Sequence, residues 1–178
     1  MSSSLGFYAS QISGHLSTNN FSSIATQTVG SGGASSITFS SIPNTYTHLQ
    51  IRMFAQTTNG NTDSTISING NSSVYRHQLY GNGSTASANA TSGDAYIIFT
   101  PGNTANTFGP AIIDILDYTN ANKNTTVRAF SGRDLNGSGY VGIGSALFTG
   151  LGPVTSITLN GFSTSYAQYS SFALYGVK

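Results

Sequence analysis

With 178 residues, 38% of them hydrophobic, the chain is long enough to bury the core of one domain. Charged residues make up only 6% of it, against about 25% in an average soluble domain, and the net charge of +1 provides no electrostatic basis for binding nucleic acid or an anionic membrane. The chain has no cysteine, which excludes disulfides, cysteine-ligated zinc and thiol catalysis. Hydrophobic residues that recur in alternating blocks, with 11% aromatics, argue against disorder.

Residues 1–20 are small and polar, apart from a few spaced hydrophobic side chains. They contain neither the basic region nor the apolar run of a signal peptide, and no stretch of the chain approaches the ~18 apolar residues of a membrane span. Two interpretations stay open, a frayed terminus and an extended N-terminal arm that docks on a partner. We predict an arm over 1–20 and a β-sandwich domain over 21–178. The residues that would dock are Leu5, Phe7, Tyr8, Ile12 and Leu16.

From residue 21 onward, short stretches with a period of two alternate with turns rich in Gly, Asn and Pro, and no stretch has a helical period. About ten antiparallel strands in one domain predict an all-β, two-sheet sandwich with jelly-roll topology, and favour it over a barrel. Residues 81–93 are expected to form a loop, while Gly142 and Gly144 inside a strand indicate a bulge or a close backbone approach. The expected strands are 24–29, 35–39, 46–56, 65–68, 74–80, 95–100, 108–118, 125–131, 140–148, 154–159 and 170–177.

The densest apolar run is FGPAIIDILDY, residues 108–118, which we expect to form a hairpin with residues 125–131. One face of this hairpin is purely apolar and would be core. The other face mixes apolar residues with an Asp–Arg pair, which indicates that a neighbouring subunit covers it. A register centred on Ala121 gives the pairs Ile115 with Val127, Ile113 with Ala129, and Asp114 with Arg128. The candidate contacts on the covered face are Ile112, Leu116, Tyr118 and Phe130.

The titratable residues do not form a catalytic pattern. The odd spacing of Asp114 and Asp117 sends them to opposite faces of a strand, whereas a glycosidase needs two converging carboxylates. The other acids, Asp63, Asp94 and Asp134, adjoin turns, where a carboxylate bonds to the backbone. The three histidines lack metal-ligand spacing and no G-x-S-x-G motif occurs, so we expect no enzyme, no cofactor and no metal site.

The sequence resembles a group of tailed-phage and marine viral proteins, generally virion-associated structural proteins. The resemblance covers nearly the whole chain and is carried by the segments GFYASQISGHL, SSITFSSIPNTYTHLQIR, SSVYRHQLYGNGSTASA, IIDILDYTNANKNTTVR and AQYSSFALYGVK. It implies a virion component, made in the host cytoplasm and released by lysis. It brings no catalytic motif with it.

These observations predict a non-enzymatic structural protein of a phage particle. The leading role is a capsid decoration or cement protein that forms a homo-oligomer, with a trimer favoured, and binds other virion proteins. The alternative is a tail-fibre or tail-tip module that binds host-surface glycan through the loops 57–63, 81–93 and 100–107.

Overall fold

The computed structural model describes residues 20–60, 63–102, 106–150 and 152–178, so the five docking residues expected in the N-terminal arm lie outside the described residues. All regular elements of the described chain are β-strands, and every pair of neighbouring strands is antiparallel. This confirms the predicted all-β, antiparallel class. Across these residues, no helix has the length and apolar character to cross a membrane. The strands are β1 (Phe21–Thr28), β2 (Ser36–Phe39), β3 (His48–Ala55), β4 (Asp63–Ile68), β5 (Ser73–Gly81), β6 (Ala86–Phe99), β7 (Gly109–Leu116), β8 (Thr125–Asp134), β9 (Gly139–Phe148), β10 (Ile157–Gly161) and β11 (Ser171–Val177).

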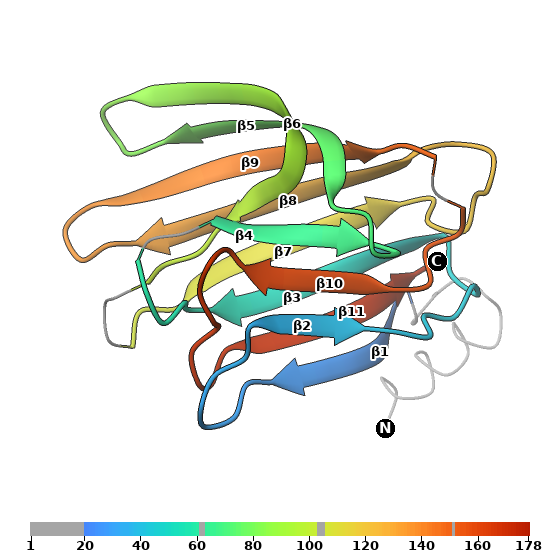
Figure 1. Cartoon of the computed structure of the whole chain (residues 1–178), viewed down its shortest axis with the longest axis horizontal. Helices are drawn as coiled ribbons and strands as arrows, with labels where there is room; N and C mark the ends of the chain where they lie inside the picture. The colour runs from blue at the N-terminus through green and yellow to red at the C-terminus, as the bar shows by residue number, and fades with distance from the viewer. Residues whose placement is uncertain (1–19, 61–62, 103–105, 151) are drawn as a thin grey trace, which may run out of the picture.

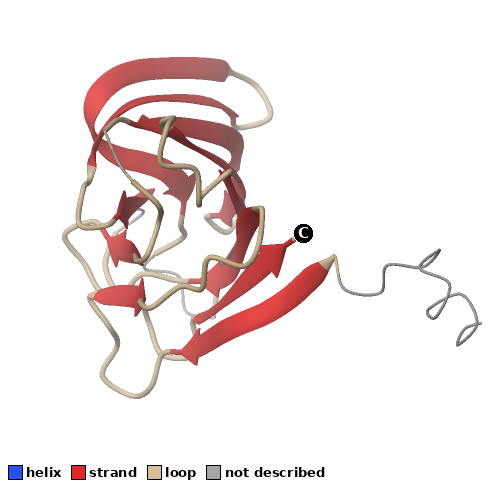
Figure 2. Cartoon of the chain, turned by 90° about the vertical axis from the view of Figure 1, so that its right-hand side faces the viewer, coloured by secondary structure: helices blue, strands red, loops and turns tan. Residues whose placement is uncertain are grey.

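The strands form one hydrogen-bonded sheet, in the order β1-β11-β3-β7-β8-β9-β5-β6-β4-β10-β2, where two separate sheets were expected. The long strand β6 joins the two parts, because its first residues pair with β5 and residues from Ala95 onward pair with β4. Gly93, with a φ of 123°, lies at the change of partner, in a conformation that glycine adopts without strain. The sheet curves round the core like a nearly closed barrel, and its edge strands β1 and β2 approach each other (Figures 1 and 2). Gln27 Nε2 of β1 donates to Thr38 O of β2 across this seam, at 2.7 Å.

The narrow part of the sheet, with β2, β10 and β4, lies over the broad part that contains β11, β3 and β7 (Figure 1). Four antiparallel pairs are nested in the chain: β1 with β11, β2 with β10, β3 with β7, and β4 with β6. Strand β5 and the β8–β9 pair extend the broad part and connect it to β6.

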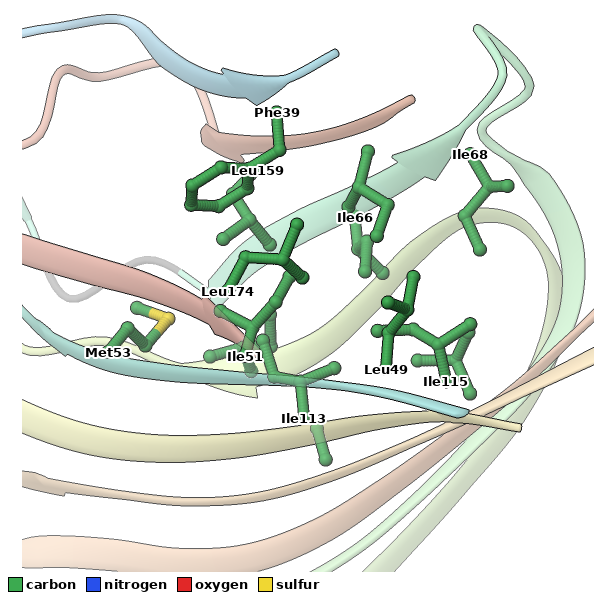
Figure 3. Packing of buried hydrophobic residues seen from close by; sticks show 14 of the residues in the cluster. Phe39, Leu49, Ile51, Met53, Ile66, Ile68, Ile113, Ile115, Leu159 and Leu174 are labelled. Carbon is green, nitrogen blue, oxygen red and sulfur yellow. The ribbon is translucent and has the colours of Figure 1, made fainter. Parts of the chain in front are cut away.

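The core lies between the two parts of the sheet. Phe39, Ile66 and Leu159 from the narrow part point toward residues such as Ile51 and Ile113 of the broad part (Figure 3). Strand β3 shows how the alternation produces this arrangement, since its predicted apolar face is buried and its polar face points outward. The buried face of β3 consists of Leu49, Ile51, Met53 and Ala55.

Gly142 and Gly144 lie on the inner face of β9, where β6 crosses close to it. A Cβ atom on Gly144 would lie 2.5 Å from Ile97 Cβ and 2.6 Å from Ile97 O. The close backbone approach predicted for these glycines is therefore confirmed, because a side chain here would push β6 out of place.

The β7–β8 hairpin has the predicted register, with Ile113 opposite Ala129 and Ile115 opposite Val127. Two other predictions are wrong. Asp117 has a φ of 48°, which ends the strand alternation and turns Tyr118 into the core, where its hydroxyl donates to Pro43 O; Tyr118 is therefore not on the outer face. Residues 81–93 are not a loop, because β6 already begins at Ala86 after a short turn.

Candidate interaction surface

The outer face of the broad part carries a continuous row of exposed apolar side chains. Ile112 of β7 lies opposite Phe130 of β8, Phe130 lies opposite Ile143 of β9, and Ile143 lies opposite Leu79 of β5. Residues directly opposite each other on antiparallel strands have Cβ atoms about 4.5–5.5 Å apart. The consecutive strands β7, β8 and β9, together with β5, thus place their side chains in one line.

A second row runs beside the first and is made of two large side chains among small ones. Phe54 lies opposite Pro110, and Val141 lies between Gly132 and Gly81 on the neighbouring strands. Together the large exposed side chains of both rows are 45–62% exposed, and they form what we call the apolar patch: Phe54, Leu79, Ile112, Phe130, Val141 and Ile143. Contiguous exposed apolar surface of this kind is typical of interaction sites, whereas isolated apolar side chains are ordinary.

Two hollows flank the centre of the patch. One, of about 300 Å³, lies between Ile112, Phe130 and Val141, and the other, of about 320 Å³, lies between Phe130, Val141 and Leu79. Glycine residues at 81 and 132, on either side of Val141, leave room for these hollows, and no charged side chain lines either of them. The patch therefore offers both ridges and depressions to an apolar partner, as closely packed interfaces do.

A polar row borders the patch on the same face. Gln50 Nε2 donates to Asp114 Oδ1 at 2.9 Å, and Arg52 Nε donates to Gln50 Oε1 at 2.8 Å. The predicted Asp114–Arg128 pair is present across β7 and β8, with 3.6 Å between Asp114 Oδ2 and Arg128 Nη2. An apolar centre with a polar border is the usual composition of a protein interface.

The patch contains two of the four outer-face residues that the sequence predicted, Ile112 and Phe130. Leu116 is half-buried on the same face, beyond the polar row, and Tyr118 is in the core. Sequence reasoning missed Leu79, Val141, Ile143 and, as a contact, Phe54. A signal existed on β9, where the inward positions 142 and 144 are glycine. The bulky residues that alternate with them, Val141 and Ile143, therefore point outward.

A second cluster, which is polar and largely buried, joins β4, β5 and β8. Arg133 Nη1 lies 3.3 Å from Asp63 Oδ1, and the guanidinium group lies over the rings of Tyr140 and Phe99, at 4.7 and 5.5 Å from their centres. Gln78 Nε2 donates to Asp63 Oδ2 at 3.5 Å. Burial raises the pKa of Asp63, and the nearby Arg133 partly opposes this increase.

This cluster was not predicted, because Asp63 was assigned to a turn. The neighbours of the Asp63 carboxylate are cations and an amide. A glycosidase would need a second carboxylate there, so the arrangement ties β4 to β5 and β8 rather than forming an acid–base pair.

The remaining predictions about polar residues have mixed outcomes. The carboxylate of Asp134 bonds to the backbone of its turn, as expected, because Asp134 Oδ1 accepts a hydrogen bond from Asn136 N at 2.8 Å. The first and third predicted binding loops lie side by side, with Thr57 N donating to Pro101 O at 2.8 Å. Within the described ranges, no three His, Asp or Glu residues are grouped so as to hold a metal ion.

No family model, curated protein or solved structure matches this chain. Its function therefore has to be inferred from the surface and the fold.

Proposed function

We propose that this protein is a non-enzymatic structural subunit of a bacteriophage particle, namely a capsid decoration or cement protein that binds neighbouring subunits through the apolar patch. The observation that carries this proposal is the continuity of the patch across the strands of the broad part of the sheet. When a second surface covers exposed apolar side chains, the free energy of the system falls by roughly 25 cal/mol per Å² of apolar area removed from water. The proposed partners are further copies of the chain, in a trimer as the favoured state, and other virion proteins.

We also propose that eight of the strands form a jelly roll, with β5 and the β8–β9 pair as insertions. The nested pairing supports this, because a jelly roll arises when a chain pairs its first strand with its last and so on inward, and the paired ribbon then wraps into two layers. Viral capsid and lectin domains both use jelly rolls. The fold is therefore compatible both with a role in a particle and with glycan binding. The two functions have to be distinguished by the residues on the protein surface.

The composition and the sequence resemblance support the phage setting. A chain with 6% charged residues has little electrostatic repulsion between copies that pack closely on a particle. The sequence resemblance to virion-associated proteins is the other support for this setting, and no matching protein adds to it. The proposed location is the virion, reached by assembly in the host cytoplasm and release by lysis.

The patch is tested with Phe130→Ser, using Phe162→Ser as a matched control. Phe162 is 45% exposed but lies beyond the end of β10, outside the patch. Removal of a central aromatic contact typically costs 2 kcal/mol or more of binding free energy, so the association constant of Phe130→Ser should fall about thirtyfold, and that of the control should not change. Sedimentation velocity over a concentration series measures both. If Phe130→Ser associates as tightly as the control, the patch is not the contact surface.

The particle setting is tested by cryo-electron microscopy of the intact virion. Density for this fold on the capsid lattice is the expected result. Density at the tail or fibre tips would instead favour the second candidate function, and a virion without this fold would exclude both.

The second candidate is a glycan-binding module of a tail appendage. The observation that favours it is a surface hollow of about 330 Å³ between the β5–β6 and β8–β9 turns, where an aromatic ring and polar groups meet. Sugars bind by stacking on aromatic rings and by hydrogen bonds to amides and charged groups. The residues that line this hollow include Asn82, Arg133, Asp134, Ser138 and Tyr140. A glycan array probed with the assembled protein, with Tyr140→Ala as the control, tests this function, and the absence of signal would count against it.

A further inference from the structure

The first half of β6 leaves one backbone edge unpaired. From Ala86 to Gly93 the strand pairs with β5, and its pairing with β4 begins only at Ala95. In the described chain, residues 86–92 have no strand on their other side, and nearly all of them are exposed. Figure 1 shows this part of β6 and the β5–β6 turn at the margin of the molecule.

The hydrogen bond that closes the β5–β6 turn shows which backbone groups point to this free edge. Asn82 N donates to Thr85 O at 3.2 Å, which makes residues 82 and 85 a hydrogen-bonded pair. Hydrogen-bonded and non-hydrogen-bonded pairs alternate along an antiparallel ladder. The N–H and C=O groups that point away from β5 therefore belong to Ala86, Ala88, Ala90 and Ser92.

This edge lacks the features that normally prevent strand pairing. Natural proteins protect exposed edges with charges, proline or bulges, or cover them with other elements. Residues 86–92 read ASANATS, without charge or proline, and their ladder with β5 is regular. The edges of β1 and β2, in contrast, face each other and are connected by the bond from Gln27 to Thr38.

We infer that the free edge of β6 pairs antiparallel with the same edge of a second copy of this chain. A two-fold axis at Asn89 would place Ala88 opposite Ala90 and Ala86 opposite Ser92, so that every outward-pointing residue joins the new ladder, with about eight hydrogen bonds in total. The strand is suited to a copy of itself, because side chains this small do not clash across the axis and no like charges meet. Leu79 lies opposite Ala88, so the pairing would extend the exposed face that carries the apolar patch into the second copy.

This inference deepens the proposed self-association and rests on it, but uses different residues. Ala88→Pro removes an outward-pointing N–H and leaves the ladder with β5 intact, since proline is tolerated where a strand edge faces solvent. Ala88→Ser keeps the N–H and is the matched control. The association constant of Ala88→Pro should fall about tenfold or more, because each copy loses a donor and the ring obstructs the approaching strand, while Ala88→Ser should associate as the wild type does.

Sedimentation velocity of these variants beside Phe130→Ser separates the two ideas. If only Ala88→Pro weakens association, the edge is the contact and the patch is not; if only Phe130→Ser does, the inference about β6 is wrong and the proposed function stands. A wild-type chain that stays monomeric at all concentrations overturns both. Circular dichroism checks that Ala88→Pro is folded.

Hydrogen exchange of the wild type gives a test that needs no substitution. The amides of Ala88 and Ala90 should exchange rapidly in dilute monomer and become about tenfold or more slower to exchange at concentrations where the chain associates. Unchanged exchange at these two amides in the associated state would overturn the inference.

Discussion

The hairpins β7–β8 and β5–β6 are both antiparallel pairs of strands that follow each other in the chain, but their surroundings are opposite. β7–β8 lies in the middle of the sheet, between β3 and β9, and its inner residues Ile113, Ile115 and Val127 have no exposed surface. In the β5–β6 hairpin, the first half of β6 lies at the margin of the molecule and is exposed on both faces. The inner face of β5 carries the polar residues Arg76 and Gln78. The central hairpin therefore contributes to the stability of the fold, while the marginal hairpin has a free edge available for a partner.

The central hairpin itself divides these roles between its two faces. Ile112 and Ile113 are neighbours on β7, yet one belongs to the exposed patch and the other to the core. Because strand side chains alternate, a single backbone can fix the core and present an interaction surface. Substitutions at adjacent positions can separate the two contributions.

The largest expected effect comes from comparing Ile113→Ala with Ile112→Ala. Ile113 is 0% exposed, so its truncation leaves a cavity and should lower the free energy of unfolding by about 2–5 kcal/mol. Ile112 is 45% exposed, and its truncation should cost about 0.5 kcal/mol or less in the monomer. Denaturant unfolding at concentrations where the chain is monomeric measures both values. Equal losses would mean that the two faces of β7 are not divided in this way.

The central hairpin could be predicted down to its register, because one of its faces is uninterruptedly apolar. The same reasoning identified the buried face of β3. It failed at Tyr118, where Asp117 adopts a positive φ that the alternation of side chains does not reveal. A tyrosine two residues past Leu116 is expected on the same face as Leu116 only if the strand continues.

The first half of β6 could not be recognised in the same way. Hydrophobic periodicity marks a strand only when one face is buried, and residues 86–92 alternate alanine with serine, asparagine and threonine while facing solvent on both sides. The full extent of the apolar patch was out of reach for another reason. Its residues come together through the pairs β3–β7 and β5–β9, which join segments far apart in the chain, and a sequence alone does not specify such neighbours.

A smaller effect is expected from Asp63, which binds the polar inner face of β5 to β4. Burial raises the pKa of this carboxyl above its usual 3.8, so the folded state binds the proton more readily than the unfolded chain does. The stability that this group contributes is therefore complete at low pH and is lost as the pH rises through the folded-state pKa. The difference in unfolding free energy between the wild type and Asp63→Asn should shift against the wild type as the pH rises above the usual carboxyl pKa of 3.8.

Urea unfolding of the two proteins at a series of pH values measures this difference. Asp63→Asn also deprives Arg133 of its anionic partner, which lowers stability at every pH, so the trend with pH is the informative quantity. A difference that grows in favour of the wild type as the pH rises would show that the ion pair with Arg133 outweighs the cost of burial.

The smallest effect is expected at the border of the patch, from the Asp114–Arg128 pair. The side chain of Arg128 is 57% exposed and that of Asp114 is 34% exposed, and such surface pairs contribute about 0.2–1 kcal/mol. A double-mutant cycle with Asp114→Asn and Arg128→Gln should give a coupling energy in this range for folding.

The patch and the β6 edge are uncharged, so raising the salt concentration should hardly change self-association, because salt screens charges and leaves apolar contacts and backbone hydrogen bonds in place. Dissociation at high salt would instead make the polar border, with its Asp–Arg pair, the part of this face that holds the copies together.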